Sequence, residues 1–397
     1  MTKNKENILI ITYWDYNDAL IQTYTLPYIK IISNTISHDS KLFLVTLNKS
    51  NKKTENSIPK ITNISFRYKK FGILGGLMWL KVVITLLYTI KKHKITTIHT
   101  WCTPAGAIGY VLSVLTRKKL IIDSFEPHAE SMVEGGTWKK NGLAFKILFK
   151  LEKLQLKRAK EVICANEGMI EYSQRVYKIK KSRYFVKPAC VDLNLFSYKN
   201  LKNEALLKEL QLDNKITCVY AGKFGGLYLE NEVFSFFKTA IDYWGDKFRV
   251  LLLTSHSNEQ IQNYMHQLNI PKEYIIRKFV AHNEVPNYMG LADFAISPNK
   301  SIPSRKFSTP IKNAEYWALG LPIVITQNIS DDSDLIFQNK IGSVIEELTP
   351  EAYLKCIKEI DLLLKEYNRK ELYEKIRPIA EKYRNFSIAE TVYKSIY

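Results

Sequence analysis

The sequence predicts an α/β protein built from two Rossmann-like domains, and three observations support this. The chain has 397 residues, which is enough for two or three domains with full hydrophobic cores. Apolar runs of strand length alternate with helical segments along the chain, and this alternation favours parallel sheets. A polar stretch from Ser197 to Asn203, near the middle of the chain, fits an exposed linker between the two domains.

The composition is that of a soluble protein with an unusual charge. Hydrophobic residues make up 46% of the chain and charged residues 24%. The formal net charge of +19 predicts attraction to an anionic partner, which is nucleic acid, a phospholipid surface or a phosphorylated substrate. Five widely spaced cysteines without a CxxC pair indicate reduced thiols, and the N-terminus lacks the apolar core of a signal peptide. We therefore expect a cytoplasmic protein.

The first β-loop-α unit combines a short apolar strand, Ile8 to Thr12, with a helical pattern from Ala19 to Ser33. Loops at the carboxyl ends of strands line the ligand site in open α/β sheets, so Asp15 in this loop is a catalytic candidate. Asp18 is explained equally well as the cap of the following helix. Further strands of this domain are expected at Leu42 to Leu47, Ile64 to Arg67, Ile95 to Thr100, Leu120 to Asp123, Val162 to Ala165 and Tyr184 to Lys187, with a helix from Pro104 to Leu115.

Two segments of the first domain suit a membrane surface. Phe71 to Ile90 is nearly continuous apolar sequence, but Lys81 at its centre argues against a transmembrane helix, since a charge there costs about 2.5–3.5 kcal/mol. We expect a helix packed on the sheet with one face toward lipid. Lys139 to Lys160 is a basic amphipathic helix, in which each basic residue near an anionic leaflet contributes about 1 kcal/mol. The alternative is a solvated helix whose apolar stripe is only core.

A loop rich in ionisable groups, Ser124 to Glu130, follows the strand that ends at Asp123. A loop in this position lines the ligand site of a parallel sheet. Because an ordinary histidine titrates near neutral pH, His128 is able to take a proton from a ligand hydroxyl, and Glu126 is able to accept hydrogen bonds from a ligand. The alternative is that both are ordinary polar surface residues.

The second domain opens with a strand, Ile216 to Ala221, that runs directly into Gly222-Lys223-Phe224-Gly225-Gly226. Glycines directly after a first strand let backbone amides approach a phosphate closely, so Gly222 and Gly225 are candidates for a phosphate loop. Further strands are expected at Val250 to Leu253, Ile275 to Phe279 and Asp293 to Ser297.

Ser304 to Thr326 predicts a loop, a capped helix, a tight turn and a buried strand. Ser308 and Thr309 are good N-cap residues, Pro310 suits the first helical position, and Gly320 suits a left-handed C-cap. Free N–H groups at this helix N-terminus would form a phosphate or diphosphate pocket, and Glu315 would accept hydrogen bonds from a sugar hydroxyl. The alternative is an ordinary capped helix before a core strand. The basic residues near this pocket are Arg305, Lys306 and Lys312.

The pattern Pro-x-Lys-x-x-Glu-Tyr-x-Ala-x-Gly-x-Pro-Ile-Val, from Pro310 to Val324, resembles the donor-nucleotide motif of bacterial GT-B glycosyltransferases of the retaining family 4 type. The resemblance implies that Glu315 binds the nucleotide ribose and that the preceding loop holds the diphosphate. It implies two Rossmann-like domains facing across a cleft: an acceptor domain, residues 1–192, and a donor domain, residues 193–374. Residues 375–397 would pack back on the first domain.

Other positions extend the resemblance, with departures. Lys223 matches a basic residue that neutralises the leaving diphosphate, but the second such residue is replaced by Leu229, and Lys312 or Arg305 would supply the missing charge. Phe307 replaces a Glu that contacts the donor sugar, and Cys190 replaces a glycine in the interdomain Pro-x-Gly-Val-Asp motif. By the same resemblance His128 and Glu126 lie near the transferred sugar, and Phe279 and Val280 lie beside the nucleobase.

The resemblance implies a reaction without metal or cofactor. Asp332-Ser333-Asp334 has the form of the DxD metal site of another glycosyltransferase fold, but a helix cap explains it more simply. The predicted function is sugar transfer from a nucleoside-diphosphate sugar to a lipid-diphosphate-linked saccharide or glycolipid, in bacterial O-antigen or capsule synthesis on the inner face of the cell membrane. Two alternatives remain open: a nucleotide-sugar 2-epimerase of the same fold, and a basic nucleic-acid-binding protein, for which the sequence offers no known binding motif.

Overall fold

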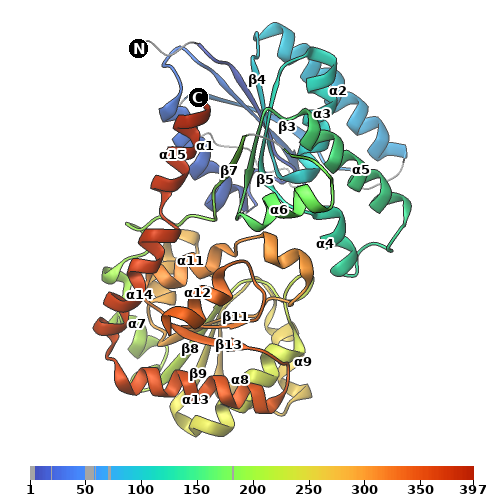
Figure 1. Cartoon of the computed structure of the whole chain (residues 1–397). Helices are drawn as coiled ribbons and strands as arrows, with labels where there is room; N and C mark the ends of the chain where they lie inside the picture. Colours follow the sequence, from blue (N-terminus) through green and yellow to red (C-terminus); the bar gives the residue numbers. More distant parts are fainter. Residues whose placement is uncertain (1–4, 19, 50–57, 59, 70–72, 181–182) are drawn as a thin grey trace. The chain divides into compact units, whose positions relative to one another are not determined.

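The computed structural model describes residues 5–18, 20–49, 58, 60–69, 73–180 and 183–397. The chain divides into two compact units, Met1–Pro188 with Ser387–Tyr397, and Ala189–Phe386 (Figure 1). The sequence analysis placed the boundary at 192/193 and returned residues 375–397 to the first domain. In the structure only residues 387–397 return, because helix α14 (Arg369–Tyr383) packs against α11 (Ile311–Ala318) within the second unit.

The first unit contains a parallel sheet of seven strands in the order β3-β2-β1-β4-β5-β6-β7. In chain order, β1 runs outward to β2 and β3 and the chain then returns to β4 on the other side of β1. This reversal of direction at β1 and β4 is the point where Rossmann-like sheets form their ligand sites. The strands are β1 (Ile8–Ile11), β2 (Leu42–Asn48), β3 (Ile61–Arg67), β4 (Thr97–Trp101), β5 (Lys119–Phe125), β6 (Glu161–Cys164) and β7 (Tyr184–Val186).

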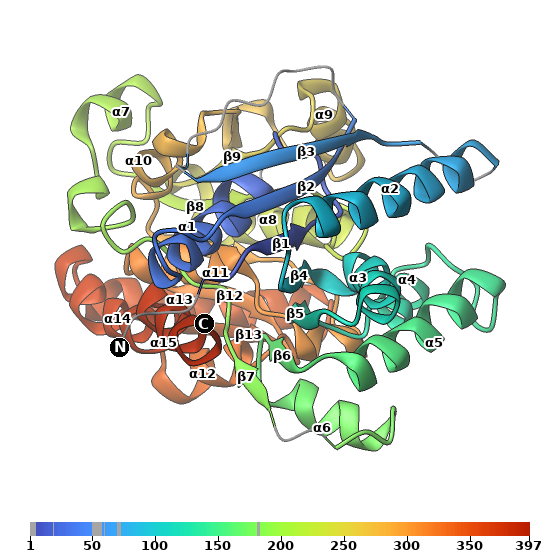
Figure 2. The same ribbon diagram turned by 90° about the horizontal axis from the view of Figure 1, so that it is seen from above.

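Helices cover both faces of this sheet. Because crossovers between parallel strands are right-handed, the reversal at β1 sends the later helices to the opposite face from α1. Accordingly α2, α3 and α5 lie on one face and α1 and α15 on the other (Figures 1 and 2). The helices are a π-helical turn (Ile21–Thr25) leading into α1 (Leu26–Thr35), then α2 (Ile73–Lys92), α3 (Cys102–Thr116), α4 (His128–Glu134), α5 (Leu143–Arg158), α6 (Gly168–Arg175) and α15 (Phe386–Ile396).

The two segments expected at a membrane are helices, with different degrees of burial. Phe71 and Gly72 lie outside the described residues, and from Ile73 onward the apolar segment forms α2. In the described part of the chain, no helix is both long and apolar enough to cross a bilayer. In α5 the predicted stripe is partly core, since Leu148 and Leu156 are buried against the rest of the unit. Its first turns, with Leu143 and Ile147, remain exposed.

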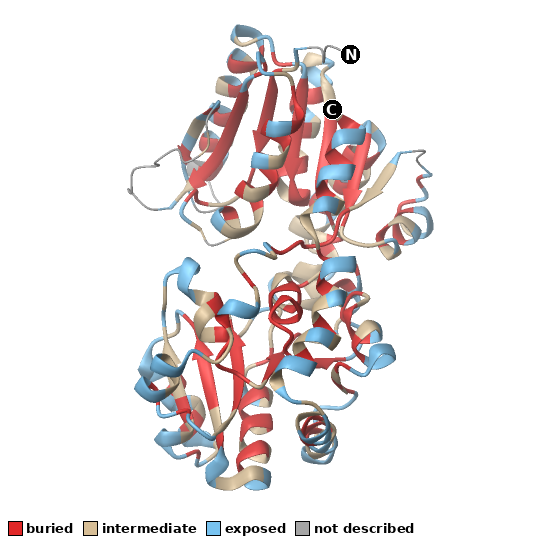
Figure 3. Cartoon of the chain, turned by 90° about the vertical axis from the view of Figure 1, so that its left-hand side faces the viewer, coloured by how far each residue is buried: buried red, intermediate tan, exposed pale blue. Residues whose placement is uncertain are grey.

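The second unit contains a parallel sheet of six strands in the order β10-β9-β8-β11-β12-β13. Alternate strand residues point to opposite faces, so Val219 and Tyr220 belong to two separate hydrophobic cores, one on each face. The inner strands of both units are buried (Figure 3). The strands are β8 (Ile216–Ala221), β9 (Phe248–Leu253), β10 (Ile275–Lys278), β11 (Phe294–Ser297), β12 (Ile323–Thr326) and β13 (Gly342–Ile345).

The helices of the second unit complete a Rossmann-like domain. The predicted left-handed residue after α11 is confirmed: Gly320 has a φ of +65°, and a Cβ there would lie 2.4 Å from the Cα of Tyr373 in α14. Each unit therefore has the Rossmann-like α/β fold that the sequence predicts, and the two units are the two predicted domains. The remaining helices are α7 (Glu204–Glu209), α8 (Asn231–Trp244), α9 (Asn258–Gln267), α10 (Val285–Met289), α12 (Asp332–Asn339) and α13 (Pro350–Glu366).

Candidate active site

The N-terminus of α11 presents unpaired polar groups. Its N-cap is Pro310, which has no side chain to cap the helix, so Ser308 and Thr309 do not play the capping role expected from the sequence. Within the described residues, the N–H groups of Ile311 and Lys312 have no hydrogen-bond partner, and the buried Ser308 hydroxyl has none either. These donors, at the positive end of a helix dipole, suit a phosphate group.

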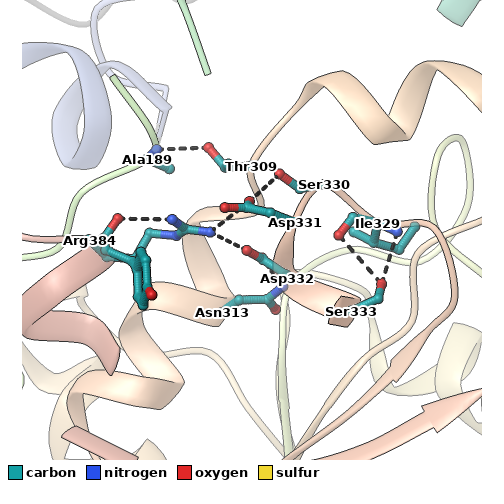
Figure 4. A network of polar contacts seen from close by, with 10 residues as sticks. Ala189, Thr309, Asn313, Ile329, Ser330, Asp331, Asp332, Ser333 and Arg384 are labelled. Atoms are coloured by element: carbon teal, nitrogen blue, oxygen red, sulfur yellow. Dashed lines mark hydrogen bonds and ion pairs between the residues drawn. The ribbon is translucent and has the colours of Figure 1, made fainter. Parts of the chain in front are cut away.

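The Thr309 hydroxyl, unlike that of Ser308, has a hydrogen-bond partner within the described part of the structure. Its hydroxyl accepts a hydrogen bond of 2.7 Å from the N–H of Ala189, at the start of the second unit (Figure 4). This contact fixes the loop before α11 against the beginning of the unit. The Thr309 hydroxyl keeps its proton for a ligand, because it acts here as an acceptor.

The end of β8 is hydrogen-bonded directly to α11. The Tyr316 hydroxyl accepts a hydrogen bond of 3.0 Å from the N–H of Ala221, the last residue of β8. The next residue, Gly222, lies against Lys312: a Cβ at Gly222 would be 2.5 Å from Lys312 Cε and 3.0 Å from Nζ. The structure thus brings together the glycine loop and the lysine that the sequence analysis assigned to one phosphate site.

Three cations surround Tyr228, which the sequence analysis did not single out. Lys312 has the largest effect, and together with Arg305 and Lys223 it lowers the pKa of the Tyr228 hydroxyl, against the opposing effect of burial. Lys312 Nζ lies 5.4 Å and Arg305 Cζ 5.9 Å from the centroid of the Tyr228 ring. We call Lys223, Arg305 and Lys312 the cation cluster. In the part of the chain that the structure describes, none of these three side chains forms an ion pair, so the cluster favours a ligand with two or more negative charges.

Arg305 is held in place by Asn299. Its guanidinium is buried and donates a hydrogen bond through Nη2 to Asn299 Oδ1, while Nε has no partner among the described residues. Asn299 pairs with Tyr228 through an isolated antiparallel bridge, so the same short segment supports both side chains. Leu229, which stands where a second basic residue was expected, is buried. Arg305 and Lys312 lie beside the ring of Tyr228, the residue before Leu229.

Glu315 lies one turn beyond the free N–H groups of α11. Burial raises the pKa of its carboxyl to about 7, although nearby Lys312 lowers it. The carboxyl forms no hydrogen bond or ion pair within the described part of the chain. A buried carboxyl without a partner is costly, and the hydroxyl groups of a ribose would supply the missing hydrogen bonds.

The remaining predicted donor residues lie on the same edge of the sheet. Gly225 has a φ of +84°, and a Cβ there would meet Glu230 Oε1 at 2.5 Å, so the turn requires glycine. Phe279 follows β10 and is 71% exposed, with Val280 half-buried beside it. β10 is two strands from β8, about 10 Å away. No described hydrogen bond, ion pair or ring contact joins Phe279 or Val280 to the cation cluster.

Asp332 belongs to a buried ion-pair network. It accepts hydrogen bonds from the guanidinium of Arg384 and, at 2.6 Å, from the Asn313 amide of α11 (Figure 4). Asp331 is the N-cap of α12 and also contacts Arg384, at 3.1 Å. The Asp-Ser-Asp segment thus begins a helix and ties it to α11. Among the described residues, no group of three or more His, Cys, Asp and Glu is arranged to hold a metal ion.

His128 and Glu126 of the first unit form a pair. Their Nδ1 and Oε1 atoms lie 3.0 Å apart at the start of α4, and the side chains are 27% and 34% exposed. The Thr103 hydroxyl donates a hydrogen bond of 2.8 Å to the Glu126 carbonyl and holds the loop. A carboxylate on Nδ1 orients the imidazole and leaves Nε2 as the accessible nitrogen, which is the arrangement of a general base.

Asp15 has a structural environment. It is largely buried, and its two carboxylate oxygens accept hydrogen bonds from the N–H groups of Asn17 at 2.9 Å and of Lys49 at 2.6 Å. These contacts anchor the loop after β1 to the end of β2. Neighbouring Asp18 accepts a hydrogen bond of 2.9 Å from the N–H of Leu20, as a cap would.

A buried carboxyl that the sequence analysis missed supports His128. Glu152 of α5 accepts hydrogen bonds from the N–H of Ala129 at 2.8 Å and from the Tyr177 hydroxyl at 2.9 Å. Burial raises the pKa of Glu152 to about 8. The one signal in the sequence is that Glu152 is the single acidic residue in an otherwise basic helix. It fixes the first turn of α4 and therefore the position of His128.

Comparison with protein families gives one match. Residues 197–383 match the family described as Glycosyl transferases group 1, which spans nearly all of the second unit. No curated protein matches the chain.

Solved structures with the same fold cover the whole chain. Sucrose-phosphate synthase from Thermosynechococcus elongatus superposes with a TM-score of 0.77 at 14% identity, covering 99% of this chain and 98% of that one. HepE from Anabaena, in complex with UDP, gives 0.69 at 13% identity, with 98% and 99% covered. WaaG, a glycosyltransferase involved in lipopolysaccharide biosynthesis, gives 0.69 at 12% identity, with 98% and 99% covered. The two Rossmann-like domains of this chain therefore form the GT-B fold.

Proposed function

We propose that this protein, which is a glycosyltransferase with the GT-B fold, transfers a sugar from a nucleoside-diphosphate sugar bound to its second unit. The observation that carries the proposal is the cation cluster beside the free N–H groups of α11. The leaving nucleoside diphosphate gains negative charge in the transition state, and these groups would stabilise it. The complex of HepE with UDP supports a nucleoside diphosphate as the ligand of this site.

The residues predicted to bind the nucleotide sugar have three roles in this proposal. Lys223, Arg305 and Lys312 neutralise the diphosphate, with Ser308, Thr309 and the backbone at Gly222 and Gly225 completing its hydrogen bonds. Glu315 binds the ribose hydroxyls, because its buried carboxyl needs partners. Phe279 and Val280 contact the nucleobase at the edge of the sheet. The reaction needs no metal ion or cofactor in this scheme.

The first unit supplies the acceptor side. His128, oriented by Glu126, takes the proton of the acceptor hydroxyl or orients the transferred sugar. The reaction proceeds with retention of configuration, through a front-face displacement assisted by the leaving phosphate. Asp15 contributes by holding the neighbouring loop.

The acceptor is a lipid-diphosphate-linked saccharide or glycolipid used for bacterial surface polysaccharide, either O-antigen or capsule. The similarity to WaaG supports this assignment, as does the basic and apolar character of the first unit. The enzyme would work peripherally on the inner face of the cell membrane, in contact with anionic lipid through residues 71–90 and 139–160.

Calorimetric titration tests the donor site. Purified protein is titrated with UDP, GDP, ADP and CMP, with magnesium and with EDTA, and compared with Lys312→Ala and Glu315→Ala. We expect one nucleoside diphosphate to bind equally with and without metal, and both variants to bind at least about tenfold more weakly. Lys358→Ala, an exposed lysine on α13, is the control. Absence of nucleotide binding, or unchanged affinity in both variants, would remove the basis of the proposal.

A second arm identifies the reaction. The nucleotide sugar that matches the bound nucleotide is incubated without an acceptor and then with a lipid-linked saccharide. A transferase releases free nucleoside diphosphate when the acceptor is present and forms a lengthened glycolipid. Formation of a new nucleotide sugar without acceptor would show an epimerase instead.

A further inference from the structure

A pocket opens at the amino-terminal edge of the first sheet, on the side away from the candidate catalytic pair. Its volume is about 440 Å³, and it lies between the C-terminal ends of α2 and α3. We call it the lysine pocket. It is lined by Leu87, Ile90, Lys91, Lys94, Thr96, Thr116 and Lys118.

The cations of this pocket are uncompensated. Lys91, Lys94 and Lys118 take part in no ion pair among the described residues, whereas the neighbouring Lys119 lies 3.5 Å from Glu161. The two hydroxyls donate inward, Thr96 to the Asn7 carbonyl and Thr116 to the Leu112 carbonyl. The ammonium groups are therefore the side-chain donors left for a ligand, and Leu87 and Ile90 supply the apolar part of the lining. This combination suits a phosphate group attached to an apolar body.

An apolar stripe on α2 leads into the lysine pocket. Successive members are three or four residues apart, so they share one face of the helix, and Lys91 continues that face into the pocket. Each member is more than half exposed. The stripe consists of Leu77 at 58%, Leu80 at 57%, Ile84 at 58% and Tyr88 at 62%.

The neighbouring helix α3 extends this apolar surface. It contains no charged residue, and its last turns expose Val111, Val114 and Leu115 immediately before Thr116 of the lysine pocket. α3 packs beside α2 on the same face of the sheet (Figure 2). Exposed apolar side chains on two adjacent helices, with lysines at the end of each, are typical of a surface that meets something both apolar and anionic.

The charge distribution along the chain matches this partner. Residues 56–122 contain eleven Lys and Arg and no Asp or Glu, although the whole chain has 39 acidic residues. No acidic side chain from this stretch can therefore repel an anionic surface or neutralise its lysines. Lipid bilayers with anionic headgroups combine the two required properties.

We propose that the lysine pocket binds the headgroup phosphate of an anionic phospholipid, with the exposed face of α2 and α3 lying on the bilayer. This inference rests on the membrane attachment put forward above and assigns it to one site. The lysine pocket is not part of the acceptor site. Lys118 of the pocket lies just before β5, whereas Glu126 and His128 lie just after it. The seven residues of β5 place these two ends of the strand about 20 Å apart.

The orientation of α2 relates this membrane attachment to the position of His128. α2 runs antiparallel to the strands, so its first turns lie toward the carboxyl edge of the sheet and its last turns end at the lysine pocket. A bilayer along its whole length, about 30 Å for 20 residues, reaches the edge that carries His128. A lipid-linked acceptor would then present its sugar to this edge while its tail stays in the membrane.

Vesicle co-sedimentation of the full chain tests the proposal. Vesicles of phosphatidylcholine alone are compared with vesicles that also contain phosphatidylglycerol, using wild type and Lys91→Ala/Lys94→Ala/Lys118→Ala. Each lysine near an anionic surface contributes about fivefold, so we expect the triple variant to bind the anionic vesicles about 100-fold more weakly. The matched control, Lys208→Ala/Lys272→Ala/Lys358→Ala, removes three exposed lysines from the second unit and should bind nearly as wild type does.

The apolar stripe is tested separately. Leu80→Ser/Ile84→Ser should weaken binding to anionic vesicles by about tenfold or more, because about 25 cal/mol is lost for each Å² of apolar surface no longer buried. Phe337→Ser/Leu362→Ser, at exposed apolar positions of the second unit, should have no effect. Excess glycerol phosphate should compete only weakly. Full displacement by it would mean that the lysine pocket binds a free phosphate and not a membrane.

Two further results would overturn the proposal. One is equal loss of binding in the two lysine triple variants, which would indicate an effect of charge without a specific site, and the other is wild-type binding by the Lys91/Lys94/Lys118 variant. Calorimetric titration of each variant with the nucleotide bound by the wild type keeps this failure separate from that of the proposed function. The variants change neither the cation cluster nor α11, so donor binding should stay unchanged whichever way the vesicle experiment turns out.

Discussion

Lys187 Nζ lies 3.1 Å from Asp123 Oδ1 in the interior of the first unit, and both side chains are fully buried. Asp123 also accepts a hydrogen bond of 2.7 Å from the Tyr393 hydroxyl and lies 3.4 Å from His99 Nε2. Burial by itself raises the pKa of Asp123, but Lys187, His99 and Tyr393 outweigh it and hold the pKa at about 2. The carboxylate is therefore ionised in the folded protein.

This cluster fastens the returning C-terminal helix to the sheet. Tyr393 of α15 bonds to Asp123 of β5, and the Tyr397 hydroxyl lies 2.6 Å from Nδ1 of His99 in β4. The Lys187 ammonium also lies 3.7 Å from the ring centroid of Tyr28 in α1. The buried charge pair and its partners thus join four elements that are far apart in the sequence: α1, β4, β5 and α15.

Removing one charge of this pair should destabilise the first unit. Asp123→Asn leaves the Lys187 ammonium buried without a counter-charge, and we expect a loss of about 3–5 kcal/mol in the free energy of unfolding. Denaturant titration followed by circular dichroism measures it. Asp246→Asn, which breaks surface ion pairs with Lys215 and Arg249, is the control and should lower stability far less than Asp123→Asn does. Equal stability of wild type and Asp123→Asn would show that the pair contributes nothing to the fold.

The same pair predicts a pH dependence. The folded pKa of Asp123 is about 2 and its ordinary value 3.8, so its contribution is fully present above about pH 5 and is lost as the pH falls from about 4 through 2. The difference in unfolding free energy between wild type and Asp123→Asn should be constant near neutrality and shrink over that acidic range. A difference that stays constant down to pH 2 would contradict an ionised Asp123.

Glu315 predicts the opposite pH behaviour. Its folded pKa of about 7 lies above the ordinary value of 4.5, so the folded state binds the proton more tightly and stability falls as the pH rises between these values. Glu315→Gln should remove this loss and stabilise the ligand-free protein at pH 8 by up to about 3 kcal/mol. The same variant should bind the nucleotide more weakly. Thermal unfolding at pH 5 and pH 8 measures the stability, and calorimetric titration measures the nucleotide affinity. If Glu315→Gln is less stable than wild type at pH 8, the stability prediction is wrong.

Gly222 should be required for donor binding and for the turn after β8. A methyl group there would lie 2.5 Å from Lys312 Cε and 2.9 Å from the Tyr220 hydroxyl, and the φ of +157° is one that a side chain rarely adopts. We expect Gly222→Ala to displace Lys312 and lower nucleotide affinity about tenfold, the effect of one lost charge-assisted hydrogen bond, and also to lower the melting temperature. Gly76→Ala, where nothing lies within 4 Å, is the control for affinity. Unchanged nucleotide affinity in Gly222→Ala would show that Lys312 does not contact the diphosphate.

The sequence was sufficient for the features that depend on local pattern. The alternation of strands and helices and the left-handed Gly320 follow from periodicity and turn chemistry, whereas the closeness of the glycine loop to α11 follows from the resemblance to GT-B glycosyltransferases. Local pattern by itself could not reveal contacts between residues far apart in the chain. Ser308 and Thr309 match cap preferences, yet Pro310 caps the helix, and the Thr309 hydroxyl is taken by Ala189, 120 residues earlier.

The same limit explains what was missed or misplaced in the first unit. The apolar residues of α5 looked equivalent in the sequence, but packing against α3 and α4 buries Leu148 and Leu156 and leaves Leu143 exposed. Asp15 stands at a strand end where catalytic residues occur, yet its carboxylate is bound by the Lys49 N–H of another strand end. Glu152 acquires its role only when α5 meets the first turn of α4.

His128 offers the most direct test of catalysis. His128→Ala removes the side chain whose Nδ1 is held by Glu126, and we expect kcat to fall by about 10²–10⁴, the usual contribution of a general base. Donor affinity should not change, because the diphosphate groups belong to the second unit. Glu126→Gln keeps the size of the side chain but weakens the orientation of the imidazole, so a smaller fall in kcat with a shifted pH–rate profile is expected. Normal kcat in His128→Ala, measured as glycolipid formed per enzyme at saturating donor, would exclude His128 from the chemical step. If kcat is retained and only the acceptor KM rises, His128 binds the acceptor and does not move its proton.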